Sequence, residues 1–171
     1  MILTTARLTL REVESRDIAV LASYQSDPRY LEHYPERPDA ERIAQLAHEW
    51  ALATPRLNHQ LMITLGSNGP VIGCAGVRQA GCPSGEAEVG VELNPDHWGA
   101  GYAREALLEL IEFARKDLGL RKLSALTTPA NLRAHRLLQS LGFSATQPLD
   151  ENACFTLSVG AVTAASIDGD F

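Results

Sequence analysis

Apolar and polar residues alternate along several parts of the chain with the two-residue period of a β-strand. Between Thr4 and Arg11, Leu8 and Leu10 share one face, which predicts a half-buried strand. Alternation also predicts strands over residues 60–65, 71–77, 86–93, 123–127 and 154–159, with another starting at residue 144. A tight turn at 66–69 and a loop at 81–85 separate the first three of these, so we expect an antiparallel meander.

Other segments have apolar residues three and four positions apart, which is the period of an α-helix. The longest run covers residues 103–118 and ends before Gly119, a residue suited to a helix C-terminus. Helices are also predicted after an N-cap at Ser15, after an N-cap at Asp39, over 131–141, and as a short element over 30–34. The order β-α-α-β-β-β-α-β-α-β-β predicts an α/β (α+β) fold with a mixed, mostly antiparallel sheet flanked by helices.

The composition limits the class of protein. A chain of 171 residues suits one domain, which we predict over residues 1–163 with a frayed tail over 164–171. With 15 Lys+Arg against 21 Asp+Glu, the net charge of −6 opposes duplex nucleic-acid binding and favours a cationic ligand. No segment approaches the roughly 20 apolar residues of a membrane span. We therefore expect no membrane partner and a cytoplasmic protein, monomeric or homodimeric.

The cysteines and histidines show no pattern of a disulfide framework or metal site. The three cysteines form no CxxC pair, and the five histidines form no HExxH pair. We therefore predict reduced thiols and no bound metal.

The segment that precedes the longest predicted helix is rich in small residues. It contains Gly99, Gly101 and Ala103. A glycine-rich turn that opens a helix collects free N–H groups, which favour an anion such as phosphate. An ordinary strand-to-helix turn has the same pattern. The P-loop does not match, because Tyr102-Ala103 follows the last glycine, and the dinucleotide motif does not match, because Arg104 occupies its third small position.

This segment resembles the acetyl-CoA signature of the GNAT N-acetyltransferase superfamily, [Q/R]-x-x-G-x-[G/A]. Gly101 and Ala103 fall on its small positions, and Trp98 stands where Gln or Arg is most common. The form WGAGYAREA over 98–106 is similar to the RimJ/RimL-like branch, which contains the ribosomal-protein N-terminal acetyltransferases. Further segments resemble that branch in the same order, namely residues 7–11 with Asp17, residues 87–91 and residues 131–143.

The resemblance implies an enzyme, an acetyl-CoA-dependent N-acetyltransferase with a GNAT-like fold. A primary amine, on a protein N-terminus or a small molecule, would attack the thioester directly. The main chain of Val91 and Leu93 would pair with the pantetheine arm, and the N–H groups from Gly99 to Arg104 would hold the pyrophosphate. The implied cofactor-binding residues are Val91, Leu93, Trp98, Gly99, Ala100, Gly101, Tyr102, Ala103, Arg104, Asn131 and Arg136.

Proton transfer requires a base, because an amine at neutral pH is mostly protonated. Glu88 and Glu92 share one face of the strand before the glycine-rich turn, and Glu88 is the first candidate. Glu92 and Glu86 are reserves, and solvated carboxylates are the alternative. Relatives carry a Tyr or Ser acid where this chain has Leu138 and Ala134, so the acid is not identified.

The acceptor side of the implied site lies in the early helical region. Relatives line their acceptor site with this region, which implies Tyr30, His33 and Tyr34 as substrate contacts. Two other functions stay open. One is a catalytically silent GNAT-like acyl-CoA-binding or regulatory module, and the other is an unrelated nucleotide-binding protein that uses the turn at Gly99–Gly101.

Overall fold

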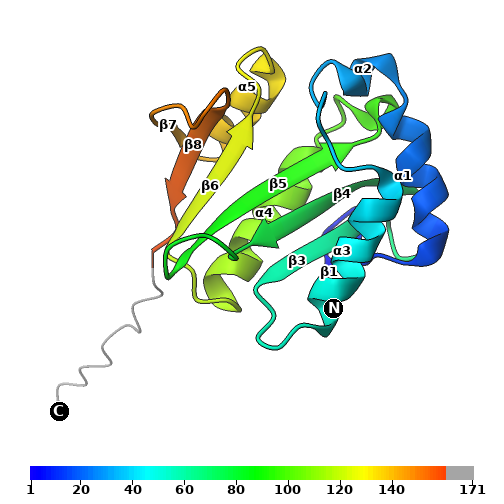
Figure 1. Ribbon diagram of the computed structural model, residues 1–171, viewed down its shortest axis with the longest axis horizontal. Coiled ribbons are helices and arrows are strands. Elements are labelled where there is room, and N and C mark those ends of the chain that lie inside the picture. Colours follow the sequence, from blue (N-terminus) through cyan, green and yellow to red (C-terminus); the bar gives the residue numbers. More distant parts are fainter. Residues whose placement is uncertain (161–171) are drawn as a thin grey trace.

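Residues 1–160, which the computed structural model describes, contain eight strands in one sheet (Figure 1). The strands are β1 (Ile2–Thr4), β2 (Leu8–Glu12), β3 (Asn58–Leu65), β4 (Val71–Arg78), β5 (Glu86–Leu93), β6 (Lys122–Thr127), β7 (Ser144–Ala145) and β8 (Ala153–Ser158). They are ordered β1-β2-β3-β4-β5-β6-β8-β7. Only β5 and β6 pair in parallel, which confirms the mixed, mostly antiparallel sheet and the predicted meander of β3, β4 and β5.

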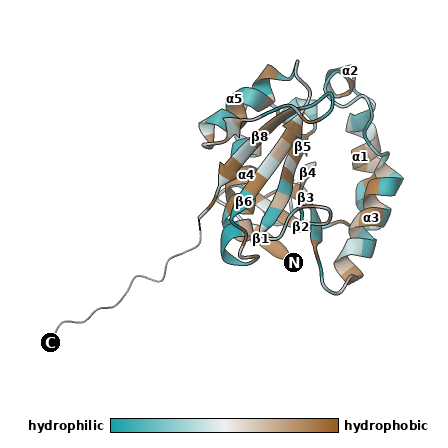
Figure 2. Ribbon diagram, turned by 60° about the vertical axis from the view of Figure 1, so that its left-hand side comes forward, coloured by the Kyte–Doolittle hydropathy of each residue, from teal (hydrophilic) through white to brown (hydrophobic). Residues whose placement is uncertain are grey.

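The helices of the described residues cover both faces of this sheet. They are α1 (Ile18–Gln25), α2 (Pro28–Leu31), α3 (Ala40–Leu52), α4 (Tyr102–Lys116) and α5 (Leu132–Ser140). The helices α1, α2 and α3 lie on one side of the sheet and α4 on the other, while α5 packs beside β6 (Figure 1). Teal and brown bands alternate along α3 and α5 in Figure 2, as expected for helices with one apolar face.

Alternation along the strands divides the buried side chains between two cores. Leu61 and Ile63 of β3 pack with Leu110 of α4, whereas Met62 and Cys74 pack with α1, α2 and α3. Because successive side chains of a strand point to opposite faces, one apolar strand serves both layers. This arrangement explains why β3 and β4 are buried along almost their whole length.

The prediction of one strand from Thr4 to Arg11 is wrong, because the segment contains parts of two strands. β1 and β2 form an antiparallel hairpin in which Leu3 lies opposite Leu10. The turn between them leaves the sheet, and the N–H of Thr5 donates to the carbonyl of Leu8 at 2.9 Å. The structure thus contains one strand more than the predicted order.

The first helix also begins later than predicted. Residues Ser15–Asp17 form a 3₁₀ turn, and α1 begins at Ile18. The carboxylate of Asp17 accepts two hydrogen bonds from Arg11 at 2.8 Å, so this acidic residue joins β2 to the helix. The predicted end of the domain at residue 163 and the frayed tail over 164–171 lie outside the described residues.

Candidate active site

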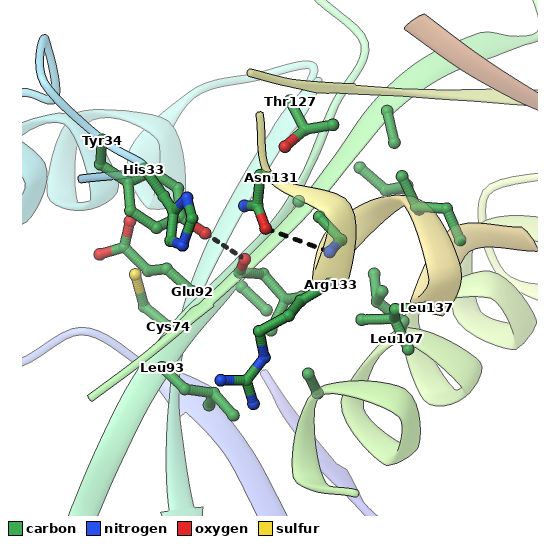
Figure 3. Close-up of a pocket in the computed structure, with 18 of the residues that line it drawn as sticks. His33, Tyr34, Cys74, Glu92, Leu93, Leu107, Thr127, Asn131, Arg133 and Leu137 are labelled. Carbon is green, nitrogen blue, oxygen red and sulfur yellow. Dashed lines mark hydrogen bonds between the residues drawn. The ribbon is translucent and has the colours of Figure 1, made fainter. Parts of the chain in front are cut away.

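The parallel strands β5 and β6 remain paired only at one end. Their register joins Glu86–Glu88 to Lys122–Ser124, and beyond this point residues 89–93 of β5 pair with β4 alone. The strands separate toward α5 and the loop after α2 (Figure 1). A cavity of about 470 Å³ opens where they part (Figure 3). We call this the β5–β6 cavity.

The β5–β6 cavity is lined by several parts of the chain. They include β5 with the turn after it, residues of β3 and β4, the end of β6, the first turns of α4, one side of α5, and the loop after α2. His33 and Tyr34 project from the α2 side, and Asn131, Arg133 and Leu137 lie on the α5 side (Figure 3). The site therefore combines residues from both halves of the sequence.

The glycine-rich turn leads into the uncapped N-terminus of α4. Gly99 and Gly101 have φ angles of 81° and 82°, in the left-handed region that favours glycine. Asp39 and Asn131 cap α3 and α5 with their side chains, but no side chain of the described part of the chain caps α4. The free N–H groups and the helix dipole make this end of the cavity suited to an anion.

Arg7 holds this turn in position, although the sequence did not identify it as a site residue. Its Nε atom lies 2.6 Å from Oε2 of Glu105, its Nη1 donates to the carbonyl of Ala100 at 2.9 Å, and its guanidinium stacks 4.5 Å from the Tyr102 ring centroid. Burial alone would raise the pKa of Glu105, but hydrogen bonds from Thr5 and Arg7 hold it below its usual range. Glu105 therefore stays ionised, and the positive charge of Arg7 offsets its negative charge in the first turn of α4.

Two side chains contact the free edge of β5. The indole N–H of Trp98 donates to the carbonyl of Leu93 at 3.1 Å, and the hydroxyl of Tyr34 donates to the carbonyl of Val91 at 3.5 Å. The guanidinium carbon of Arg133 lies 4.7 Å from the Trp98 ring centroid. The carbonyl groups of Val91 and Leu93 therefore point into the cavity rather than toward β4.

Glu88 and Glu92 have different surroundings. The Glu92 side chain is 1% exposed and accepts hydrogen bonds from Tyr24 at 2.9 Å, Tyr30 at 3.1 Å and Arg37 at 2.5 Å. The Glu88 side chain is 34% exposed and has one partner, Arg78, at 3.0 Å. Glu88 therefore has an oxygen free for a ligand, whereas three donors surround Glu92.

Comparison with known proteins identifies the family. Residues 7–144 match the sequence profile of the "Acetyltransferase (GNAT) domain". The chain belongs to the GNAT acetyltransferase family. It is 33% identical over 146 residues to the uncharacterized N-acetyltransferase p20 of Bacillus licheniformis, covering 82% of this chain and 81% of p20.

Solved structures agree with this membership. A crystal structure of an acetyltransferase from Agrobacterium tumefaciens strain C58 shares 26% identity at a TM-score of 0.77, covering 92% of this chain and 94% of that one. Spermidine N-acetyltransferase from Vibrio cholerae, solved with CoA and spermine, has a TM-score of 0.72 at 17% identity over 89% of this chain and 94% of that one, which shows a shared fold. The present chain is thus a GNAT enzyme that acetylates amines.

The GNAT chain gathers most of the predicted site residues around one cavity. Those that line it are Glu88, Glu92, Val91, Leu93, Trp98, Gly99, Gly101, Tyr102, Ala103, Arg104, Asn131, His33 and Tyr34. Three others do not line it: Ala100 turns its carbonyl to Arg7, Tyr30 lies buried against Glu92, and Arg136 is exposed on α5. The reserve candidate Glu86 pairs with Lys122 at 3.2 Å, away from the cavity.

The lining also includes arginines that the sequence did not identify as site residues. They are Arg37, Arg78 and Arg133. Alternation along β4 puts Arg78 on the face of Gly76 and Cys74, which could have identified it. Arg37 stands between Pro35 and Pro38 in a segment without periodicity, so only the folded chain reveals its contact with Glu92.

Within residues 1–160, no helix is long and apolar enough to cross a membrane, and no group of three or more metal-ligating side chains is present.

Proposed function

We propose that this GNAT enzyme transfers the acetyl group of acetyl-CoA to a primary amine, on a small molecule or a protein N-terminus, by direct attack on the thioester. One observation carries the proposal: the free edge of β5 and the uncapped start of α4 border the same cavity. The form of residues 98–106 supports membership of the RimJ/RimL-like branch.

In this proposal the pantetheine arm lies in the β5–β6 cavity as an added strand. Val91 and Leu93 present their carbonyl groups to the cavity, and an extended ligand can pair with such an edge. Asn131 uses Oδ1 to cap α5 through the N–H of Ala134 at 3.2 Å, which leaves its amide NH₂ for the arm. Acetyl-CoA supplies the thioester that the amine attacks.

The pyrophosphate would rest on the first turn of α4. The N–H groups from Gly101 to Arg104 have no side-chain cap, and Arg7 already neutralises Glu105. Arg104 and Arg133 line the cavity and add positive charge. A diphosphate is therefore attracted by the helix dipole and by both guanidinium groups.

Proton transfer in this proposal uses Glu88 as the base and Tyr34 as the acid. Glu88 takes a proton from the ammonium group, directly or through water, and the free amine then attacks the acetyl carbon. The C–N bond forms, the C–S bond breaks, and the Tyr34 hydroxyl gives a proton to the CoA thiolate. The second proton lost by the nitrogen restores the Tyr34 hydroxyl through water. Burial, with the charge of Glu92, raises the pKa of Tyr34 to about 12, so this hydroxyl carries its proton at neutral pH.

A catalytically silent acyl-CoA-binding module remains the second candidate. Its supporting observation is that Leu138, at the position where relatives carry a Tyr acid, is 5% exposed within the main core. Such a module would bind acetyl-CoA without releasing CoA in the presence of any amine.

The decisive experiment is calorimetric titration with acetyl-CoA, followed by thiol release with a panel of amines. Gly101→Glu should abolish binding, because it adds a carboxylate and a side chain at a positive φ where the phosphates would rest. Gly119→Glu is the matched control, since Gly119 also has a positive φ, 64°, but does not line the cavity. If the unaltered protein fails to bind acetyl-CoA, the proposed function is wrong.

A further inference from the structure

The charge around the β5–β6 cavity has the opposite sign to the charge of the chain. The chain carries a net charge of −6. Among the described residues, however, the cavity is lined by four arginines (Arg37, Arg78, Arg104, Arg133) and only two carboxylates. Both carboxylates are already paired, Glu92 with Arg37 and Glu88 with Arg78. The expectation of a cationic acceptor, which rested on net charge, has no support at the site.

Two glycines open a strip of bare backbone between these ion pairs. Gly76 of β4 lies opposite Gly90 of β5, and the flanking rows join Cys74 to Glu92 and Arg78 to Glu88. All six residues face the side of the sheet that α1, α2 and α3 cover, because the register keeps alternate residues on one face. We call Gly76 and Gly90 the glycine strip.

The guanidinium of Arg78 lies over the glycine strip. A Cβ atom at Gly76 would be 3.0 Å from Nη1 of Arg78, and one at Gly90 would be 3.0 Å from Nη2. Any side chain at these two positions would therefore crowd the arginine. The guanidinium therefore covers the strip, between the Arg37–Glu92 pair and the Arg78–Glu88 pair.

Arg37 still has hydrogen-bond donors to offer. Its Nε atom donates to Glu92, but neither Nη atom has a partner within residues 1–160, and the side chain is 30% exposed. A guanidinium with free terminal N–H groups is well suited to a carboxylate, which it can hold with two parallel bonds.

A second hollow of about 190 Å³ lies between α3 and the sheet. It shares Arg37, Gln60, Arg78 and Glu88 with the β5–β6 cavity. Its remaining wall is mostly apolar, formed by Pro38, Ile43, Leu46 and Trp50. We call it the α3 hollow. Polar groups thus lie at its mouth and apolar groups along its wall.

We propose that the acceptor is an α-amino carboxylate with an apolar side chain, an inference that rests on the proposed function. Its carboxylate binds the free Nη atoms of Arg37, its amine lies beside the free oxygen of Glu88, and its side chain enters the α3 hollow. The amine nitrogen bonds to the acetyl carbon, the C–S bond breaks, and the proton lost by the amine balances the proton taken up by the CoA thiolate. The products are an N-acetyl amino acid and CoA.

A panel of matched acceptors tests this inference by CoA release from the unaltered enzyme. It contains L-phenylalanine, L-phenylalaninamide, 2-phenylethylamine, L-leucine, spermidine and a short peptide with a free N-terminus. Because a charged hydrogen-bonded pair is lost without the carboxylate, kcat/KM should fall about 10- to 100-fold from phenylalanine to its amide or amine. Equal or faster turnover of the amide, of spermidine or of the peptide overturns the acceptor class but leaves acetyl transfer standing. No turnover with any amine overturns both.

A double variant tests the role of Arg37. The single change Arg37→Gln would leave Glu92 buried without its cation, so Arg37→Gln/Glu92→Gln removes both charges. It should raise KM for phenylalanine at least tenfold and bring the amino acid and its amide to similar kcat/KM, while KM for acetyl-CoA stays unchanged. Arg56→Gln is the control, because Arg56 pairs with Glu12 at 2.8 Å away from the cavity.

An undiminished preference for phenylalanine in the folded double variant would overturn the inference. If that variant does not fold, the acceptor panel on the unaltered enzyme still decides the question.

Discussion

At the residue scale, two glutamates that look alike in the sequence have different surroundings in the folded chain. Both stand on the same face of β5, but Glu92 is enclosed by Tyr24, Tyr30 and Arg37, whereas Glu88 keeps a free oxygen at the cavity. Alternation was sufficient to predict the shared face. It could not distinguish a structural carboxylate from an accessible one, because the partners of Glu92 come from segments 55 to 68 residues away.

The proposed proton-transfer pair is tested by Glu88→Gln and Tyr34→Phe. Each change removes one ionisable group and keeps the shape of the side chain. We expect kcat to fall about 100-fold in each variant, the lower range for general acid–base catalysis, with KM for acetyl-CoA unchanged. Steady-state kinetics measure both values, and unchanged kcat in either variant would reject that residue as a proton carrier.

Glu92→Gln should have a different effect from Glu88→Gln. It leaves Arg37 partly buried without an anion, and we expect the free energy of unfolding to fall on the order of 2 kcal/mol, less than for a fully buried pair because Arg37 is partly exposed. Urea denaturation measures this change. A stability equal to that of the parent chain would show that the three donors do not depend on the charge of Glu92.

At the element scale, the start of α4 depends on the turn between β1 and β2. Arg7 contacts Ala100, Tyr102 and Glu105 across more than 90 positions of sequence. Alternation predicted residues 4–11 as one strand, whereas residues 5–7 form the turn between β1 and β2. Interaction with α4 decides the local geometry, since the turn at Thr5 to Arg7 turns its polar groups toward Glu105.

Arg7→Gln tests whether this contact organises the cofactor turn. Without the guanidinium, the carbonyl of Ala100 loses its donor, and the negative charge of Glu105 is left unbalanced near the expected phosphates. The dissociation constant for acetyl-CoA should rise about tenfold, the effect of losing one charge-assisted contact. Calorimetry measures it, with Arg115→Gln as the control, because Arg115 forms its ion pair within α4 with Glu112 at 3.0 Å. Equal weakening in both variants would contradict a specific role for Arg7.

At the scale of the whole molecule, a buried histidine makes stability depend on pH. His59 is 5% exposed and packs against Phe113 at 5.2 Å between ring centroids. Neither of its ring nitrogens has a hydrogen-bond partner among residues 1–160. Burial, assisted by the positive charge of Arg56, lowers its pKa from 6.5 to about 4. The folded chain therefore takes up this proton at lower pH than the unfolded chain does.

This difference in proton binding decides whether stability rises or falls with pH. Between pH 6.5 and about 4 the unfolded chain binds a proton at His59 that the folded chain does not, so stability falls as the pH falls. For one proton, the free energy of unfolding changes by up to about 1.4 kcal/mol per pH unit. Denaturant unfolding of the parent chain and of His59→Leu should diverge in this range, with the variant less dependent on pH. His48→Leu, at an exposed position of α3, is the control and should follow the parent.

The sequence by itself determined most of the elements, the mixed sheet and the family, because local periodicity and the glycine motif are encoded in neighbouring residues. Only the tertiary structure decided which charges meet in the cavity. Arg37, Arg78 and Arg133 reach it from three different segments, and the opposed glycines Gly76 and Gly90 become adjacent only through strand register. Net charge is a sum over the whole surface, whereas a ligand responds to the few groups within a Debye length of it. The acidic chain can therefore contain a cavity whose charged lining residues are mostly arginine.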